Sequence, residues 1–244
     1  MILRRVIKHF RNQEWTAIFL DFLIVVVGVF VGLQVQNWNQ ARLAAQAERS
    51  LLLEMHTALT RDAAVINREL VRARDLDERI SALLIHLQAR VPYQKSLDAE
   101  FGAVYGIGSM DLDRAAYESL KSQGINMITD PLLRSTISQL YERIYVQVNT
   151  TVRIEENVAF EVMRPYFLAH FRDMRFSKSA TPLDYDAVQA DPYFRNMAAY
   201  RRAALRKGPL LVFETALENI NNLIAAIENE LGDSELEEKN DQAH

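Results

Sequence analysis

An uninterrupted apolar run near the N-terminus dominates the pattern of apolar and polar residues in this chain. From Trp15 to Val35 the only charged side chain is Asp21, and the only amide is Gln34. A helix of about 20 mainly apolar residues spans the hydrocarbon core of a bilayer, which is about 30 Å thick. The run therefore predicts a transmembrane helix over residues 15–38, with the lipid bilayer as its first partner.

Beyond this run, apolar residues recur at helical spacing, and no strand pattern stands out. Within residues 39–90 the periodicity is seven residues. The repeating positions are Leu52, Leu59, Ile66, Ala73, Ile80 and Leu87. Leu76 and Leu83 complete the stripe in the distal half, whereas the matching positions nearer the apolar run are Asp62 and Glu69. We expect one long helix, continuous with the transmembrane helix and more tightly packed in its distal half.

Capping residues delimit the helices that follow. Residues 97–105 read as a short helix, and another begins at Asp111 or Asp113 and ends at Gly124. The Asp-Pro pairs at 130–131 and 191–192 favour helix starts, since proline is well tolerated at the first helical position. We expect four further helices, the last two of them long.

The helix after Asp130 carries one apolar stripe that we expect to face the core. It consists of Leu133, Ile137, Leu140, Ile144, Val148 and Val152, with a possible continuation to Val158 and Val162. Pro165 is expected to kink or end this helix. The polar stretch 177–190, which contains Pro182, reads as a loop.

The last helix follows Asp191 and is interrupted at Gly208-Pro209. Its second part has the most regular seam of the chain, in which apolar residues alternate at intervals of three and four. The seam is Leu210, Phe213, Leu217, Ile220, Ile224, Ile227 and Leu231. Gly232 is expected to end the helix, and the acidic tail 233–244 is expected to be disordered.

Charges beside the apolar run predict its orientation. Before it stand Arg4, Arg5, Lys8 and Arg11, whereas Arg42 and Arg49 follow it together with Glu48. Lysine and arginine are retained on the cytoplasmic side of a membrane. We therefore predict an all-α protein that begins with a short basic cytoplasmic segment (1–14) and a transmembrane helix (15–38). An extracytoplasmic antiparallel bundle of long helices (39–232) and the disordered tail (233–244) follow. A cleaved signal peptide is the competing interpretation, but its apolar region would be shorter and followed by a cleavage site.

Composition and motifs argue against several functional classes. The 244 residues include 28 basic and 32 acidic side chains, and this net charge of −4 gives no sign of nucleic-acid binding. The chain has no cysteine, and no metal, nucleotide or hydrolase motif is recognisable. The acidic pairs Glu155-Glu156 and Glu237-Glu238 are interpreted as solvated faces. We predict no enzymatic activity and no cofactor.

Two sets of residues are candidates for binding. Asp21, Gly28, Gly32 and Gln36 share one face of the apolar helix, and a carboxylate with a small-xxx-small pattern is typical of a helix–helix contact in a membrane. Separately, Arg134 and Arg195 each lie in a first helical turn, where a cation opposes the helix dipole. These arginines are expected either to have carboxylate partners or to line an anion or ligand pocket together with Tyr117.

Two stretches carry a family resemblance. The exit Leu33-Gln34-Val35-Gln36-Asn37-Trp38-Asn39 and the segment Tyr117-Glu118-Ser119-Leu120-Lys121-Ser122-Gln123-Gly124 resemble motifs of a bacterial family of uncharacterised single-span membrane proteins. This resemblance implies a helical exported domain and brings no known activity.

The leading functional hypothesis is therefore an interaction or scaffold protein of the bacterial inner membrane, which associates with itself or with another membrane protein. The alternative is a sensory or small-ligand-binding periplasmic domain that acts through a separate membrane partner. An envelope hydrolase is a third class, and no motif supports it.

Overall fold

The computed structural model describes residues 14–106, 108 and 110–241. It divides into two units, residues 1–50 and 51–244, which are described separately. The basic residues on which the orientation depends, Arg4 to Arg11, lie outside the described part. The described residues are overwhelmingly helical, so the prediction of an all-α protein is confirmed.

The first unit contains the N-terminal part of helix α2 (Glu14–Gln88). Every side chain described from Phe19 to Ala47 is exposed. The most apolar window of this helix has a mean hydropathy of 2.1 and no buried residue, so it is long and apolar enough to cross a membrane. A second apolar helix, within Pro192–Gly232, has a mean hydropathy of 1.3 and is one third buried, as expected for a helix that contributes to a core.

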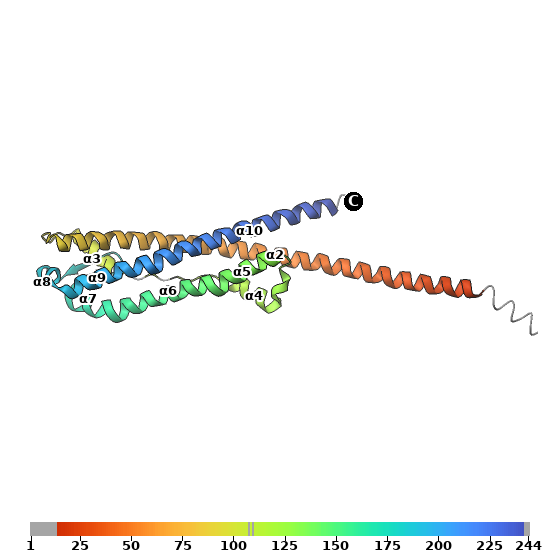
Figure 1. Cartoon of the computed structure of the whole chain (residues 1–244), viewed down its shortest axis with the longest axis horizontal. Coiled ribbons are helices and arrows are strands. Elements are labelled where there is room, and N and C mark those ends of the chain that lie inside the picture. The colour runs from red at the N-terminus through yellow and green to blue at the C-terminus, as the bar shows by residue number, and fades with distance from the viewer. Residues whose placement is uncertain (1–13, 107, 109, 242–244) are drawn as a thin grey trace, which may run out of the picture. The chain divides into compact units, whose positions relative to one another are not determined.

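The second unit contains the rest of α2 and the elements that follow it (Figure 1). Three short elements come next: α3 (Leu97–Val104), α4 (Ala115–Gln123) and the 3₁₀ turn η1 (Ile125–Met127). A long helical segment then comprises α5 (Pro131–Gln139), η2 (Leu140–Ile144), α6 (Tyr145–Asn157), η3 (Val158–Met163) and α7 (Arg164–His170). Strands β1 (Phe171–Arg175) and β2 (Ser179–Pro182) precede α8 (Tyr185–Ala190), α9 (Pro192–Leu205), η4 (Arg206–Leu210) and α10 (Leu211–Asp241).

Three of the predicted capping residues begin or end helices in the structure. The Asp130 carboxylate accepts hydrogen bonds from the backbone N–H groups of Leu132 and Leu133, and α5 begins at Pro131. Asp191 caps α9 in the same way. Gly124 ends α4 with a φ of 106°, a conformation that side chains with a Cβ rarely adopt.

Buried apolar residues of the second unit form two clusters. The proximal core, which is nearer to the apolar segment along α2, contains Leu59 and Ile66, whereas the distal core contains Ile80 and Leu83. All six residues of the seven-residue repeat in α2 are at most 3% exposed, which confirms that this stripe faces the core. Along α2 and along α5–α7, residues of the proximal core come before residues of the distal core in the sequence. Along α9–α10 this order is reversed. The α9–α10 segment therefore runs opposite to the other two (Figure 1).

Three π-helical turns change the register of the predicted stripes. η2 and η3 lie within the segment after Asp130, and η4 contains Gly208-Pro209. A π turn adds a residue to the helical repeat, so the apolar stripe moves by one position after it. Ala159 and Met163 are buried instead of Val158 and Val162, and Val162 is 42% exposed. The continuation of the stripe to Val162 is thus wrong, and the helix continues past Pro165 to His170.

Two other predictions fail at local level. The stretch 171–182 forms an antiparallel hairpin with a register shift between Arg172 and Arg175, which the sequence did not reveal because its two strands are short. The last helix does not end at Gly232. This glycine is not among those with positive φ, which a glycine cap requires, and the helix-forming residues after it continue α10 to Asp241. The backbone of 233–241 is therefore helical, and residues 242–244 lie outside the described part.

Candidate functional site

In the first unit, the predicted contact face of the apolar helix is open. Asp21, Gly28, Gly32 and Gln36 are all exposed. A Cβ atom added at either glycine would meet no other atom within 4 Å. At the end of this segment the guanidinium of Arg42 lies 5.7 Å from the centre of the Trp38 ring. Within residues 19–50, whose side chains the structure describes, the face is thus open.

The residues of the predicted anion pocket do not come together at one site. Tyr117 is buried in the proximal core and stacks on Tyr141, with ring centres 4.5 Å apart. The guanidinium of Arg134 donates to the side-chain oxygen of Asn126 at 2.6 Å. Arg195 is exposed on α9, next to Phe194, which belongs to the distal core. Tyr117 and Arg195 therefore belong to regions that pack on different cores.

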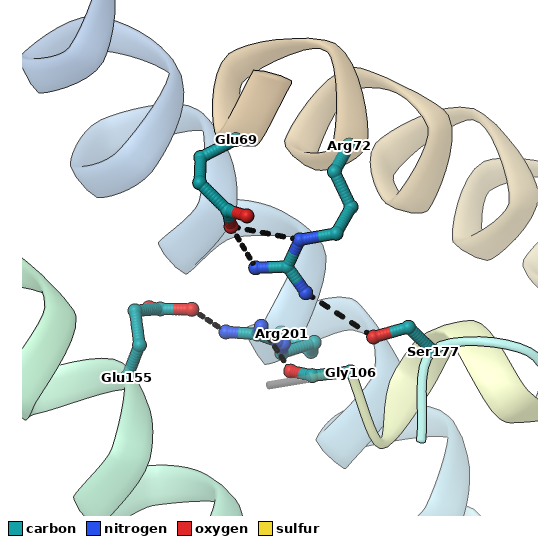
Figure 2. Close-up of polar contacts among 6 residues, drawn as sticks. All are labelled: Glu69, Arg72, Gly106, Glu155, Ser177 and Arg201. Atoms are coloured by element: carbon teal, nitrogen blue, oxygen red, sulfur yellow. Dashed lines mark hydrogen bonds and ion pairs between the residues drawn. The ribbon is translucent and has the colours of Figure 1, made fainter. Parts of the chain in front are cut away.

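A buried ionic cluster lies where the two cores meet, and its central residue is Arg201 of α9 (Figure 2). Arg201 is only 2% exposed, and it forms an ion pair with Glu155 of α6. Its Nη2 atom donates a hydrogen bond to the backbone oxygen of Gly106 at 2.8 Å. Burial, together with the charge of nearby Arg72, lowers the pKa of Arg201 to about 10, so the guanidinium remains charged at neutral pH.

Helix α2 contributes a second ion pair to this cluster. Nε of Arg72 donates to Oε2 of Glu69 at 2.9 Å, and Nη1 donates to the hydroxyl of Ser177 in the hairpin turn at 3.2 Å (Figure 2). A Cβ atom at Gly108 would lie 2.0 Å from Nη2 of Arg72, so a larger residue there would displace the end of the Arg72 side chain. The cluster therefore joins α2, α6, α9, the hairpin and the segment after α3.

The four charged side chains line a cavity together with apolar residues such as Ala73, Leu76 and Phe213. Its volume is about 20 Å³, which matches a single water molecule. Nε of Arg201 is buried beside it without a hydrogen-bond partner in the described residues. The cavity thus combines charged and apolar lining residues, and its volume corresponds to about one water molecule.

The sequence prediction for Glu155 was wrong. We interpreted the Glu155-Glu156 pair as a solvated face, whereas Glu155 is 8% exposed and paired with Arg201. The signal was present, because Glu155 follows Val148 and Val152 on the apolar stripe of α6. Arg201 likewise occupies a stripe position of α9. When each of two helices carries a charged residue of opposite sign on its apolar stripe, the pattern indicates a buried ion pair.

A second buried polar contact lies inside the proximal core. Asp62 of α2 is 2% exposed and accepts hydrogen bonds from the hydroxyl of Tyr145 at 2.5 Å and from the N–H of Asp113 at 3.0 Å. Burial raises the pKa of Asp62 despite these hydrogen bonds. The Asp62 side chain is therefore buried and has hydrogen-bond donors for its carboxylate. The expectation of looser packing in this part of α2 does not hold at this position.

A third buried carboxylate anchors the distal end of the unit. Asp98 of α3 accepts hydrogen bonds from Tyr93 and from Thr181 of β2, and it pairs with Lys95. Burial alone would raise the pKa of Asp98, but these three donors outweigh it and lower the pKa below its ordinary value. The contact holds the hairpin against α3.

Comparison of the chain with protein-family models, with curated proteins and with solved structures found no match. Among the described residues no group of three or more His, Cys, Asp or Glu side chains is arranged to hold a metal ion.

Proposed function

We propose that this protein is a single-pass membrane protein whose helical domain lies outside the cytoplasm and acts by binding other proteins, as a scaffold or interaction component. The observation that carries the proposal is the complete exposure of the apolar part of α2. An apolar helix of this length whose described side chains from Phe19 to Ala47 are all exposed fits a bilayer, since exposure of so many large side chains to water is unfavourable. The family resemblance would place this membrane in the bacterial inner envelope.

The distribution of charge supports the orientation. Basic residues are concentrated before the apolar segment, and this bias predicts a cytoplasmic N-terminus. A reporter enzyme active only outside the cytoplasm, fused after His244, should then be active, and a reporter active only in the cytoplasm should be inactive. The reverse pattern would refute the orientation. A mature N-terminus near Glu48 would instead show that the apolar segment is a cleaved signal.

The open face of the apolar helix supports association within the membrane. If Gly28 and Gly32 contact a second helix, a leucine at either position would prevent close approach of the backbones. We expect Gly28→Leu and Gly32→Leu each to abolish the association, and Val27→Leu and Phe30→Leu, on other faces, to preserve it. Asp21→Asn should weaken it less, because an amide still donates and accepts hydrogen bonds.

Single cysteines provide a direct measurement, since the chain has none of its own. Cross-links should form at Gly28 and Gly32 and be weak at Val27 and Phe30. Equal cross-linking at all four positions, or none, would contradict a specific contact. The identity of the cross-linked species distinguishes self-association from binding to another membrane protein.

A further inference from the structure

The ionic cluster lies between the two apolar cores of the second unit, and beside it the partly buried Leu210 of η4 packs against both cores. Between Val148 of the proximal core and Ala159 of the distal core, the only buried residue of α6 is Glu155. In the α9–α10 segment, Leu205 belongs to the distal core and Val212 to the proximal core, with η4 between them. Arg201 and Glu155 thus stand where continuous apolar packing would otherwise join the cores.

The backbone also changes at this level in two of the three long helical segments. η3 begins at Val158, just after Glu155, and η4 contains Pro209, which has no N–H to donate. Helical hydrogen bonding is therefore irregular on both sides of the ion pair, whereas α2 passes the same level as a regular α-helix. Close to the ion pair, the regular α-helical hydrogen-bond pattern is interrupted at η3 within α5–α7 and at η4 within α9–α10.

We propose that the domain consists of two cooperative units, the proximal core and the distal core, which open separately and are joined at the ionic cluster. The physical reason is that cooperativity spreads through contiguous apolar packing, in which loss of one side chain removes contacts of its neighbours. A layer of paired charges supplies few such contacts, so loss of order in one core does not require loss in the other. The half nearer the apolar segment can rearrange while the hairpin end stays folded.

Two residues of α2 provide a matched test. Ile66 and Ile80 lie on the same stripe, fourteen positions apart, and each is 0% exposed, but Ile66 belongs to the proximal core and Ile80 to the distal core. Amide hydrogen exchange of the full chain in detergent is measured by mass spectrometry for the parent, Ile66→Ala and Ile80→Ala. A truncation of this size typically accelerates exchange through the affected opening by roughly thirtyfold or more.

We expect Ile66→Ala to accelerate amide exchange in α4 and α5 and to change the exchange rates in α3 and α7 by less than about threefold. Ile80→Ala should accelerate exchange in α3 and α7 and change the rates in α4 and α5 by less than about threefold. Equal acceleration of both halves by each variant would overturn the proposal, because it would show a single cooperative unit. If either alanine variant fails to fold, Ile66→Val and Ile80→Val provide the same comparison with a smaller perturbation.

A second comparison tests whether the ionic cluster causes the division. The double substitution Glu155→Leu with Arg201→Met replaces the charges by apolar side chains and joins the two cores. In this background, Ile66→Ala should accelerate exchange in α7 as well as in α5. If the effect stays confined to the proximal half, the charges are not what separates the cores, and that part of the proposal is wrong.

Discussion

Replacement of Arg201 by methionine should destabilise the domain strongly. Arg201 is 2% exposed, and its partner Glu155 has a side chain only 9% exposed, so the substitution leaves a buried carboxylate without its cation. Breaking a buried ion pair by removal of one partner costs about 3–5 kcal/mol. For a domain of this size, 1 kcal/mol corresponds to about 2–4 °C in Tm, so Tm should fall by roughly 6–20 °C.

The partner substitution determines whether the charge or the volume is responsible. In Glu155→Leu with Arg201→Met neither charge remains, and apolar replacement of a buried pair is often neutral or stabilising by about 1–4 kcal/mol. We therefore expect the double variant to be at least as stable as the parent, although each single variant is much less stable. The measurement is urea or thermal unfolding of the full chain in detergent, followed by circular dichroism at a helical wavelength.

Arg206→Met is the matched control for this experiment. Arg206 pairs with Asp77 through Nε and Nη2, at 2.8 and 2.9 Å, but its side chain is 55% exposed. The guanidinium is screened by water and salt, although the Asp77 side chain is only 13% exposed, so loss of this pair should cost less than loss of the buried pair. If Arg201→Met costs no more than Arg206→Met, or if the double variant is as unstable as the two single variants together, the energetic role of the buried pair is refuted.

Three further predictions concern packing and pH. Gly102→Ala should cost about 1–3 kcal/mol, because its Cβ would lie 2.2 Å from a backbone nitrogen of β2. Gly232→Ala, in open space within α10, should instead stabilise the helix by about 0.5–1 kcal/mol. A higher Tm for Gly102→Ala than for Gly232→Ala would contradict this packing. Ile220→Asp should cost at least about 3 kcal/mol, because it places a charge at a position that is 0% exposed, and the exposed Asn222→Asp serves as the control. The lowered pKa of Asp98 stabilises the fold above the ordinary value of 3.8, and this stabilisation is lost as pH falls through the folded pKa. The difference in free energy of unfolding between the parent and Asp98→Asn should therefore shrink on acidification, and a constant difference would show that Asp98 does not contribute through its charge.

Local features of this protein could be derived from the sequence because their causes are local. The Asp-Pro pair at 130–131 begins α5 because one carboxylate caps the free N–H groups and proline already has a helical φ. The seven-residue repeat from Leu52 to Leu87 predicted the buried face of α2, since side-chain direction follows helical geometry alone. The apolar run ending at Trp38 predicted a transmembrane helix, and the structure has there a helix long and apolar enough to cross a membrane.

The tertiary structure decided features that depend on which segments meet. At η3 the buried positions are Ala159 and Met163, one residue away from the predicted Val158 and Val162, and the periodicity of the sequence did not reveal this π turn. Glu155 lies at a stripe position of its own helix, but only the approach of Arg201 from a helix 46 positions later supplies the cation that makes its burial favourable. The division into two cores has the same origin, because a charged layer forms only where three helices bring their polar stripe positions to one level. The sequence by itself therefore determined the helices, their caps and the apolar segment, whereas the ionic cluster and the separation of the cores required contacts between residues far apart in the chain.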